Sequence, residues 1–204
     1  MSISLKKGEK IDLRKSDGAG LTRIMVGLGW DPAKPGLARS LLGIVTLGIM
    51  GSNVDCDATA MLCVNGKLVD QSADIVYFGH LEHKSGAVQH MGDNLTGDGD
   101  GDDEQIMVDL TKLPEKYDKI IFVINIFLAK LRFQHFGMLQ NAFIRICDEK
   151  DQEFCRYDLS GKEYNGMTSL IFGEVYRQDG VWKFNAIGKA TTDGGLGSLA
   201  EKFK

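Results

Sequence analysis

Apolar and polar residues alternate with a period of two through most of this 204-residue chain, and this pattern constrains the fold more than any other feature. Ile24, Val26 and Leu28 are separated by single residues of another kind, and the segment Val54–Val64 alternates in the same way. Successive side chains of a strand point to opposite faces of a sheet, so this period predicts β-strands. Further strands are predicted at Asp74–Gly79, Ala87–Met91, Gln105–Leu110, Asp118–Leu128, Phe143–Cys147, Glu153–Leu159, Ser169–Arg177 and Val181–Gly188.

Turn dipeptides separate the predicted strands. Asn65-Gly66 and Asp179-Gly180 carry the strongest hairpin signals, because a tight type I′ turn needs two residues that tolerate positive φ. Ser85-Gly86 and Ser160-Gly161 mark further turns. Many short strands at hairpin spacing predict an all-β fold, a sandwich of two antiparallel sheets with few short helices.

The helical signal is thin. Leu196–Phe203 is predicted as a terminal helix, whereas the pattern at Leu128–Phe136 fits more than one structure. No internal repeat divides the chain and no linker forces a second domain, so residues 1–204 are expected to form a single domain. Gly29–Gly51 is the least regular connection.

Composition excludes several classes of function. The net charge is −4, and no cluster of Lys and Arg is interleaved with aromatic residues, so a nucleic-acid interface is not expected. The first residues, MSISLKKGEKIDL, lack the apolar core of a signal peptide. The longest apolar run, Leu41–Gly51, is about half the length that spans a bilayer, which favours a buried strand over an interfacial segment. We therefore do not expect an integral membrane protein.

Four cysteines occur without any CxxC pairing, which argues against a zinc knuckle. Without a signal sequence, these thiols are expected to be reduced in the cytoplasm and to be structural. They are Cys56, Cys63, Cys147 and Cys155.

One segment stands apart, Gly92–Glu104, which reads GDNLTGDGDGDDE. Its six carboxylates are Asp93, Asp98, Asp100, Asp102, Asp103 and Glu104, and no Lys or Arg occurs from Ser85 to Thr111. Two carboxylates ~5 Å apart repel by roughly 3 kcal/mol at an effective dielectric of ~20. A cation would relieve that repulsion, and hard oxygen donors on a glycine-rich backbone suit Ca²⁺.

Acidic segments of this composition are often only solvated turns. Here Asn94 and Thr96 add neutral oxygen donors, strand-like segments flank the run, and glycines separate the acids in DGDGDD. These features favour a metal site over a solvated turn.

Asp55 and Asp57 lie two residues apart on a predicted strand and therefore share one face. The opposite face carries the apolar residues Val54, Cys56 and Ala58. The pair is either two exposed aspartates at a sheet edge or a second arm of the metal site.

Known calcium motifs do not fit the acidic run. An EF-hand loop beginning at Asp98 would need Gly at its sixth position and Glu at its twelfth. The chain has Asp103 and Asp109 at those positions. The glycine-rich β-helix nonapeptide must recur, and here it does not.

Histidines and tryptophans give weaker signals. His80 and His83 fall near a strand end, where histidines are usually solvated, so a soft-metal site with His90 and His135 is not favoured. The two tryptophans, Trp30 and Trp182, are expected to anchor the core.

Several segments together resemble the TerD family of tellurium-resistance and general stress proteins. They are VGLGWD (26–31), VDCDATAMLC (54–63), the strand and loop at 74–83, GDNLTGDGDGDDEQI (92–106), FGMLQNAFIRICD (136–148), IFGEVYRQDGVWKFNAIG (171–188) and GGLGSLAEKF (194–203). The resemblance covers essentially the whole chain in order. It implies a cytosolic, calcium-binding β-sandwich with metal in its acidic loops.

Carried over by position, the resemblance implies metal ligands in two groups. The better-matched group is Asp93, Asn94, Asp102, Asp103 and Glu104, with Thr96 between, while Asp98 and Asp100 fall where the family pattern is looser. Asp57, and beside it Asp55, match acids that the family carries on a strand. The apolar run Leu41–Gly51 departs from the polar connection that relatives usually carry.

The expected function is calcium binding without catalysis. Calcium would order the acidic loop against the Asp55/Asp57 strand, and the ordered surface would bind protein partners of a stress or resistance complex. One alternative is a metal-dependent phosphoester hydrolase, although neither a Walker loop nor an HExxH motif is present. The other is a small-molecule module of the cyclic-nucleotide-binding kind, which rests on the resemblance alone.

Overall fold

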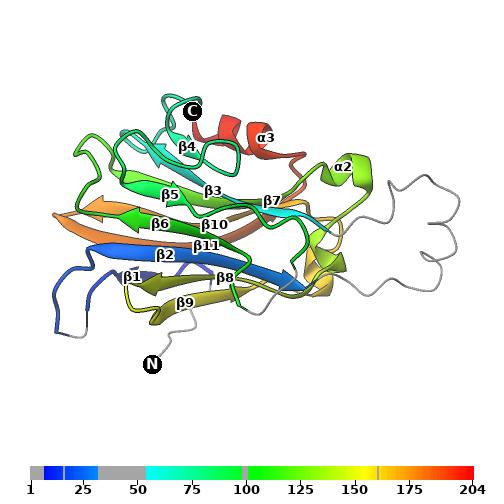
Figure 1. Ribbon diagram of the computed structural model, residues 1–204, viewed down its shortest axis with the longest axis horizontal. Helices are drawn as coiled ribbons and strands as arrows, with labels where there is room; N and C mark the ends of the chain where they lie inside the picture. The colour runs from blue at the N-terminus through cyan, green and yellow to red at the C-terminus, as the bar shows by residue number, and fades with distance from the viewer. Residues whose placement is uncertain (1–6, 16, 32–53, 98–100, 160) are drawn as a thin grey trace, which may run out of the picture.

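Two antiparallel sheets face each other in the computed structural model, which describes residues 7–15, 17–31, 54–97, 101–159 and 161–204 (Figure 1). The first sheet, in the order β1-β11-β10-β7-β3-β4, consists of β1 (Lys10–Asp12), β3 (Cys56–Cys63), β4 (Ile75–Val76), β7 (Lys119–Ile126), β10 (Ser169–Gln178) and β11 (Val181–Thr191). The second, in the order β5-β6-β2-β8-β9, consists of β2 (Arg23–Asp31), β5 (Val88–His90), β6 (Glu104–Asp109), β8 (Gln140–Asp148) and β9 (Glu153–Asp158). The predicted all-β sandwich is confirmed.

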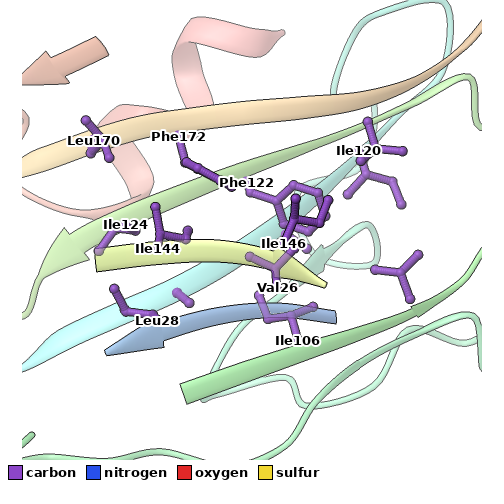
Figure 2. Packing of buried hydrophobic residues seen from close by; sticks show 14 of the residues in the cluster. Val26, Leu28, Ile106, Ile120, Phe122, Ile124, Ile144, Ile146, Leu170 and Phe172 are labelled. Carbon is purple, nitrogen blue, oxygen red and sulfur yellow. The ribbon is translucent and has the colours of Figure 1, made fainter. Parts of the chain in front are cut away.

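The main core fills the space between the two sheets. Alternate residues of β2 and β6, such as Val26, Leu28 and Ile106, point inward and meet Phe122 of β7 and its neighbours (Figure 2). Burying one such side chain contributes about 1.5 to 3 kcal/mol. The period-two pattern therefore follows from the need to bury one face of each sheet.

A second apolar cluster lies on the outer face of the six-stranded sheet. Met61 of β3 and Ile121 of β7 pack there with Leu199 of α3 (Leu196–Ala200). The 3₁₀ helix η3 (Glu201–Phe203) follows, and the Leu68 N–H donates to the Phe203 carbonyl at 2.7 Å. The predicted terminal helix is confirmed, and it explains why β3 and β7 are buried on both faces.

The other helices are short: α2 (Ala129–Arg132), η1 (Phe136–Met138) and η2 (Lys162–Tyr164). Of the helices in the described part of the chain, none has the length and apolar character needed to cross a bilayer.

Both predicted hairpin turns are present. Asn65 and Gly66 have φ of 53° and 73°, and Asp179 and Gly180 have φ of 52° and 75°. Each pair is the two-residue turn between paired residues, Val64 with Lys67 and Gln178 with Val181. Positive φ at both central residues is the backbone shape that favours Asn-Gly and Asp-Gly.

Several predicted boundaries were wrong. The strand predicted over Asp74–Gly79 shrinks to Ile75–Val76. The strand predicted to reach Leu128 ends at Ile126, because Leu128 takes a left-handed φ of 53° and begins α2. The three-residue β1 was not predicted, since three residues are too few to show a period. The predicted buried strand at Leu41–Gly51 lies outside the described residues.

The four cysteines are buried and form no disulfide, as their assignment as structural residues requires. Cys56 and Cys155 belong to the core between the sheets, and Cys63 belongs to the outer cluster. Burial raises the pKa of both the Cys63 and the Cys147 thiols to about 12, so both stay protonated at neutral pH.

We predict that Leu199→Ala lowers the free energy of unfolding by about 2 to 5 kcal/mol, because it leaves a cavity under the terminal helix. Leu199 is fully buried. Urea denaturation of the variant measures the change, with the exposed Val69→Ala as the control. Equal stability of the two variants would show that the terminal helix contributes little.

Candidate metal centre

The early part of β3 has an open edge. The short strand β4 pairs with β3 only at Ala60 and Met61, so it does not reach the residues near Cys56. Glu104 of β6, in the opposite sheet, fills this place, and its Oε2 accepts a hydrogen bond from the Ala58 N–H at 2.7 Å. A buried carboxylate thus links the two sheets where strand pairing stops.

Glu104 is surrounded by groups that set its charge. His90 Nε2 lies 3.4 Å from Glu104 Oε2, and His90 Nδ1 accepts from the Gly92 N–H, which places the ring proton on Nε2. Burial raises the pKa of Glu104, contacts with His90 and Ala58 lower it, and the nearby Asp93 raises it further. Asp93 therefore lies close to the buried carboxylate of Glu104.

Three further carboxylates meet beside this link. One oxygen each from Asp55, Asp57 and Asp93 can be chosen so that all lie within 4.8 Å of one another. Asp55 and Asp57 are 5% and 3% exposed, while Asp93 is exposed. The sequence correctly predicted that Asp55 and Asp57 face away from the apolar side of β3, but the alternative of an exposed pair at a sheet edge is wrong.

The donors around this cluster do not satisfy its oxygens. Asp57 Oδ2 accepts from the Asn125 side-chain amide at 2.8 Å, and an Arg132 guanidinium nitrogen lies 3.8 Å from Asp55 Oδ2. Asp55 Oδ1 is buried and has no hydrogen-bond partner among the described residues. Burying a carboxylate oxygen without a hydrogen-bond partner costs folding free energy. A cation that prefers oxygen ligands would offset this cost by binding that oxygen directly.

Electrostatics within the cluster favour the protonated acids when no cation is bound. Burial raises the pKa of Asp55 to about 6, and the neighbouring Asp93 adds to the effect. Burial raises the pKa of Asp57 to about 8, with further increases from Glu104, Asp55 and Asp93. At neutral pH a cation bound here would therefore displace at least one proton.

Asp102 points elsewhere, onto the outer face of the five-stranded sheet. Its two oxygens accept from Arg145 Nε at 2.7 Å and from a terminal Arg145 nitrogen at 2.8 Å, and Gln105 donates to it at 3.1 Å. The three residues meet over Gly27, where a Cβ would lie 2.4 Å from the carboxylate. Arg145, which is distant in the sequence, thus neutralises Asp102, which has no Lys or Arg near it in the sequence.

Asp103, Asn94 and Thr96 form the frame of the acidic turn. Asp103 accepts from the Trp30 N–H and from the Asn94 side-chain amide, both at 2.8 Å. Asn94 Oδ1 accepts from the Thr96 and Gly97 N–H groups at 3.1 Å. These hydrogen bonds hold the turn over the end of β2. The predicted ligands Asp98 and Asp100 lie outside the described residues.

The expectation that His83 is solvated was wrong, and His80 is only partly exposed. His83 and His90 are each 1% exposed. His83 Nδ1 lies 2.7 Å from Ser85 Oγ, and its Nε2 lies 3.2 Å from the Tyr117 hydroxyl and 3.4 Å from Asp74. Burial lowers the pKa of His83. Its network is separate from the carboxylate cluster.

Sequence reasoning missed the residues that complete these arrangements. Arg132 and Arg145 carry no local signal, because their acidic partners lie far away in the sequence. Asn125 does carry one, since it is the single polar side chain in the apolar run IIFVINIF. A buried amide in such a run needs a partner, and here the partner is Asp57.

Comparisons with known proteins agree with this architecture. A model of the TerD domain matches residues 1–203. The stress response protein SCP2 of Bacillus subtilis is 48% identical over 204 residues, 100% of each chain. The tellurium resistance protein TerD of Serratia marcescens is 39% identical over 204 residues, 100% of this chain and 97% of its own. A solved homologue of the telluride resistance protein from Streptomyces coelicolor has a TM-score of 0.68 at 19% identity, covering 91% of this chain and 99% of that one, which supports the fold alone.

We predict that the stability of the protein in chelator falls as pH rises from 5 to 8.5. Asp55 and Asp57 have folded pKa values of about 6 and about 8, above the roughly 3.9 of an unfolded Asp. Their contribution to stability is therefore complete below about pH 4 and is lost as pH rises through the folded values. Urea midpoints across this range measure the fall.

The matched variant is Asp57→Asn, which keeps the shape of the side chain and removes its titration. Its stability should fall less steeply over the same range, because the other titrating groups are unchanged. Parallel pH profiles for the variant and the wild type would contradict the assignment of the raised pKa to Asp57.

Proposed function

This chain belongs to the TerD domain family, and from that premise we propose that it is a calcium-binding protein of the stress-response and tellurium-resistance class that acts without catalysis. Asp55, Asp57 and Asp93 would hold the ion. The observation that carries the proposal is the buried Asp55 oxygen that lacks a hydrogen-bond partner beside two further carboxylates.

The type of donor favours calcium. Three carboxylates are hard oxygen ligands; Asp57 belongs to β3 and Asp55 directly precedes it. Asp93 comes from a connection between strands of the other sheet, so it can adjust to the size of the ion. Calcium accepts irregular oxygen shells of six to eight ligands, whereas Mg²⁺ demands near-octahedral geometry.

The remaining residues of the acidic run would position the turn and would not bind the ion directly. Asp102, Asp103 and Asn94 already bind protein groups at short distances. Their role in this proposal is to hold the turn so that Asp93 reaches β3. Glu104 adds negative charge beside the ion and links the sheets through the Ala58 N–H.

Calcium would fasten Asp93 and its neighbours to β3. Binding to the folded state alone stabilises a protein by about 2.7 kcal/mol when free ligand is about 100 times the dissociation constant. The same segment presents Met91 and Leu95, which are 55% and 60% exposed. We propose that the segment, once fastened, presents this surface to protein partners of a stress-response complex.

We predict that calcium raises the thermal midpoint of the wild-type protein and that Asp93→Asn abolishes this shift. Asp93 is exposed, so its substitution should change the stability in chelator little. Calorimetric titration and thermal unfolding with and without calcium measure the effects. Asp158→Asn is the control, because that exposed acid pairs only with Arg156 in the described contacts.

The variant Asp102→Asn tests whether Asp102 stabilises the turn or binds the ion. Breaking its buried pair with Arg145 should lower stability by about 3 kcal/mol both in chelator and in calcium. The calcium-induced shift should remain. An unchanged midpoint of the wild type at saturating calcium would exclude the proposed function, and turnover of generic phosphoesters that Asp93→Asn abolishes would favour a hydrolase instead.

A further inference from the structure

A cavity of about 210 Å³ opens on the outer face of β3 and β7, next to the carboxylate cluster. Its walls are largely apolar and include Tyr77, Phe78, Phe127 and the segment 194–196 before α3. Phe78 makes edge-to-face contacts with Tyr77 and Phe127, with ring centroids 5.3 and 5.9 Å apart. The aromatic wall is therefore a packed unit. An engineered cavity of about 150 Å³ is known to hold benzene, so this volume suits a small aromatic molecule.

Three polar side chains from adjacent strands line the same cavity: Asp57 and Thr59 of β3 and Asn125 of β7. All three are more than nine-tenths buried. Thr59 Oγ1 and Asn125 Oδ1 have no hydrogen-bond partner among the described residues. The Asn125 amide nitrogen donates to Asp57, so the group left over is an acceptor.

Buried polar atoms without partners are uncommon in folded proteins, and each one suggests a missing binding partner. The atoms left here are mainly oxygen acceptors, so the partner must bring hydrogen-bond donors. The lining contains one acid and no base. Lys130 packs beside Gly194 but is not among the residues that line the cavity.

We propose that this cavity binds a primary ammonium group carried on a small aromatic or apolar body. An ammonium group has three N–H donors, which match the three oxygen-bearing side chains Asp57, Thr59 and Asn125. The aromatic rings of the wall suit both the cation and its apolar body. Phosphates and carboxylates are disfavoured, because the lining holds no base to balance their charge and its unpartnered atoms are mainly acceptors.

The cavity and the carboxylate cluster share Asp57. Two cations that use one carboxylate repel each other, so bound amine and bound calcium should weaken each other's binding by the same factor. The cavity itself requires neither Asp55 nor Asp93. Binding of the amine in chelator is therefore independent of whether the protein binds calcium.

Calorimetric titration in chelator tests the proposal with three probes of one shape. Phenethylamine should bind, 2-phenylethanol should bind at least about 10-fold more weakly, and 3-phenylpropionate should not bind at millimolar concentration. Equal binding of the amine and the alcohol would overturn the ammonium assignment. Absence of binding by all three would overturn the cavity as a ligand site.

Thr59→Val provides the matched variant. It keeps the volume of the side chain and removes a buried hydroxyl that has no partner, so the stability of the free protein should not fall. Affinity for phenethylamine should fall about 3- to 10-fold. Unchanged affinity would place the amine elsewhere.

Asp93→Asn is the second variant, and phenethylamine should still bind to it in chelator, because Asp93 does not line the cavity. A loss of amine binding in this variant would show that the site is the carboxylate cluster and not the cavity. Failure of calcium binding in the wild type, with amine binding intact, would overturn the proposed function alone.

Discussion

The open edge of β3 is the constraint on which the candidate site depends. Because β4 is only two residues long, the Ala58 N–H has no strand to pair with, and Glu104 of the opposite sheet binds it instead. That contact places a carboxylate in the interior, beside the acids that β3 itself carries. Asp93 then joins them from the connection after β5. The missing stretch of strand pairing has thus gathered several carboxylates in one place, and their raised pKa values reflect the cost of ionising them together.

Asp102 and Asp93 belong to the same short acidic run but lie in different environments, because different residues surround them. Asp102 lies over Gly27, between Gln105 and Arg145, and both of its oxygens are bound. Asp93 lies among other carboxylates. In the first arrangement both carboxylate oxygens accept hydrogen bonds, whereas the second leaves the buried Asp55 Oδ1 without a hydrogen-bond partner among the described residues. Composition alone could not separate them, because both were simply acids in a glycine-rich segment.

The sequence predicted the fold well, because burying one face of each sheet imposes a local period, and because Asn-Gly and Asp-Gly encode turn geometry directly. It also predicted that Asp55 and Asp57 share a face. It did not predict that they are buried, because burial depends on what covers the strand, and that cover comes from elsewhere in the chain. The role of Arg145 was not predicted for the same reason, because an ion pair between residues far apart in the sequence produces no recognisable spacing. The length of β4 was overestimated, because a strand-like composition does not show how many residues pair with the neighbouring strand.

The acidic segment is fastened to the five-stranded sheet at one end without any ion. Asp103 accepts from the Trp30 N–H, and its own N–H donates to the Leu28 carbonyl at 2.8 Å. Local opening in the absence of calcium would therefore be confined to the part of the segment near Asp93. Amide hydrogen exchange would then divide the run into a protected half and a half whose protection follows the ion concentration. If calcium binds as we propose, it would restrict the mobility of only these few residues, and the two sheets around them would stay packed.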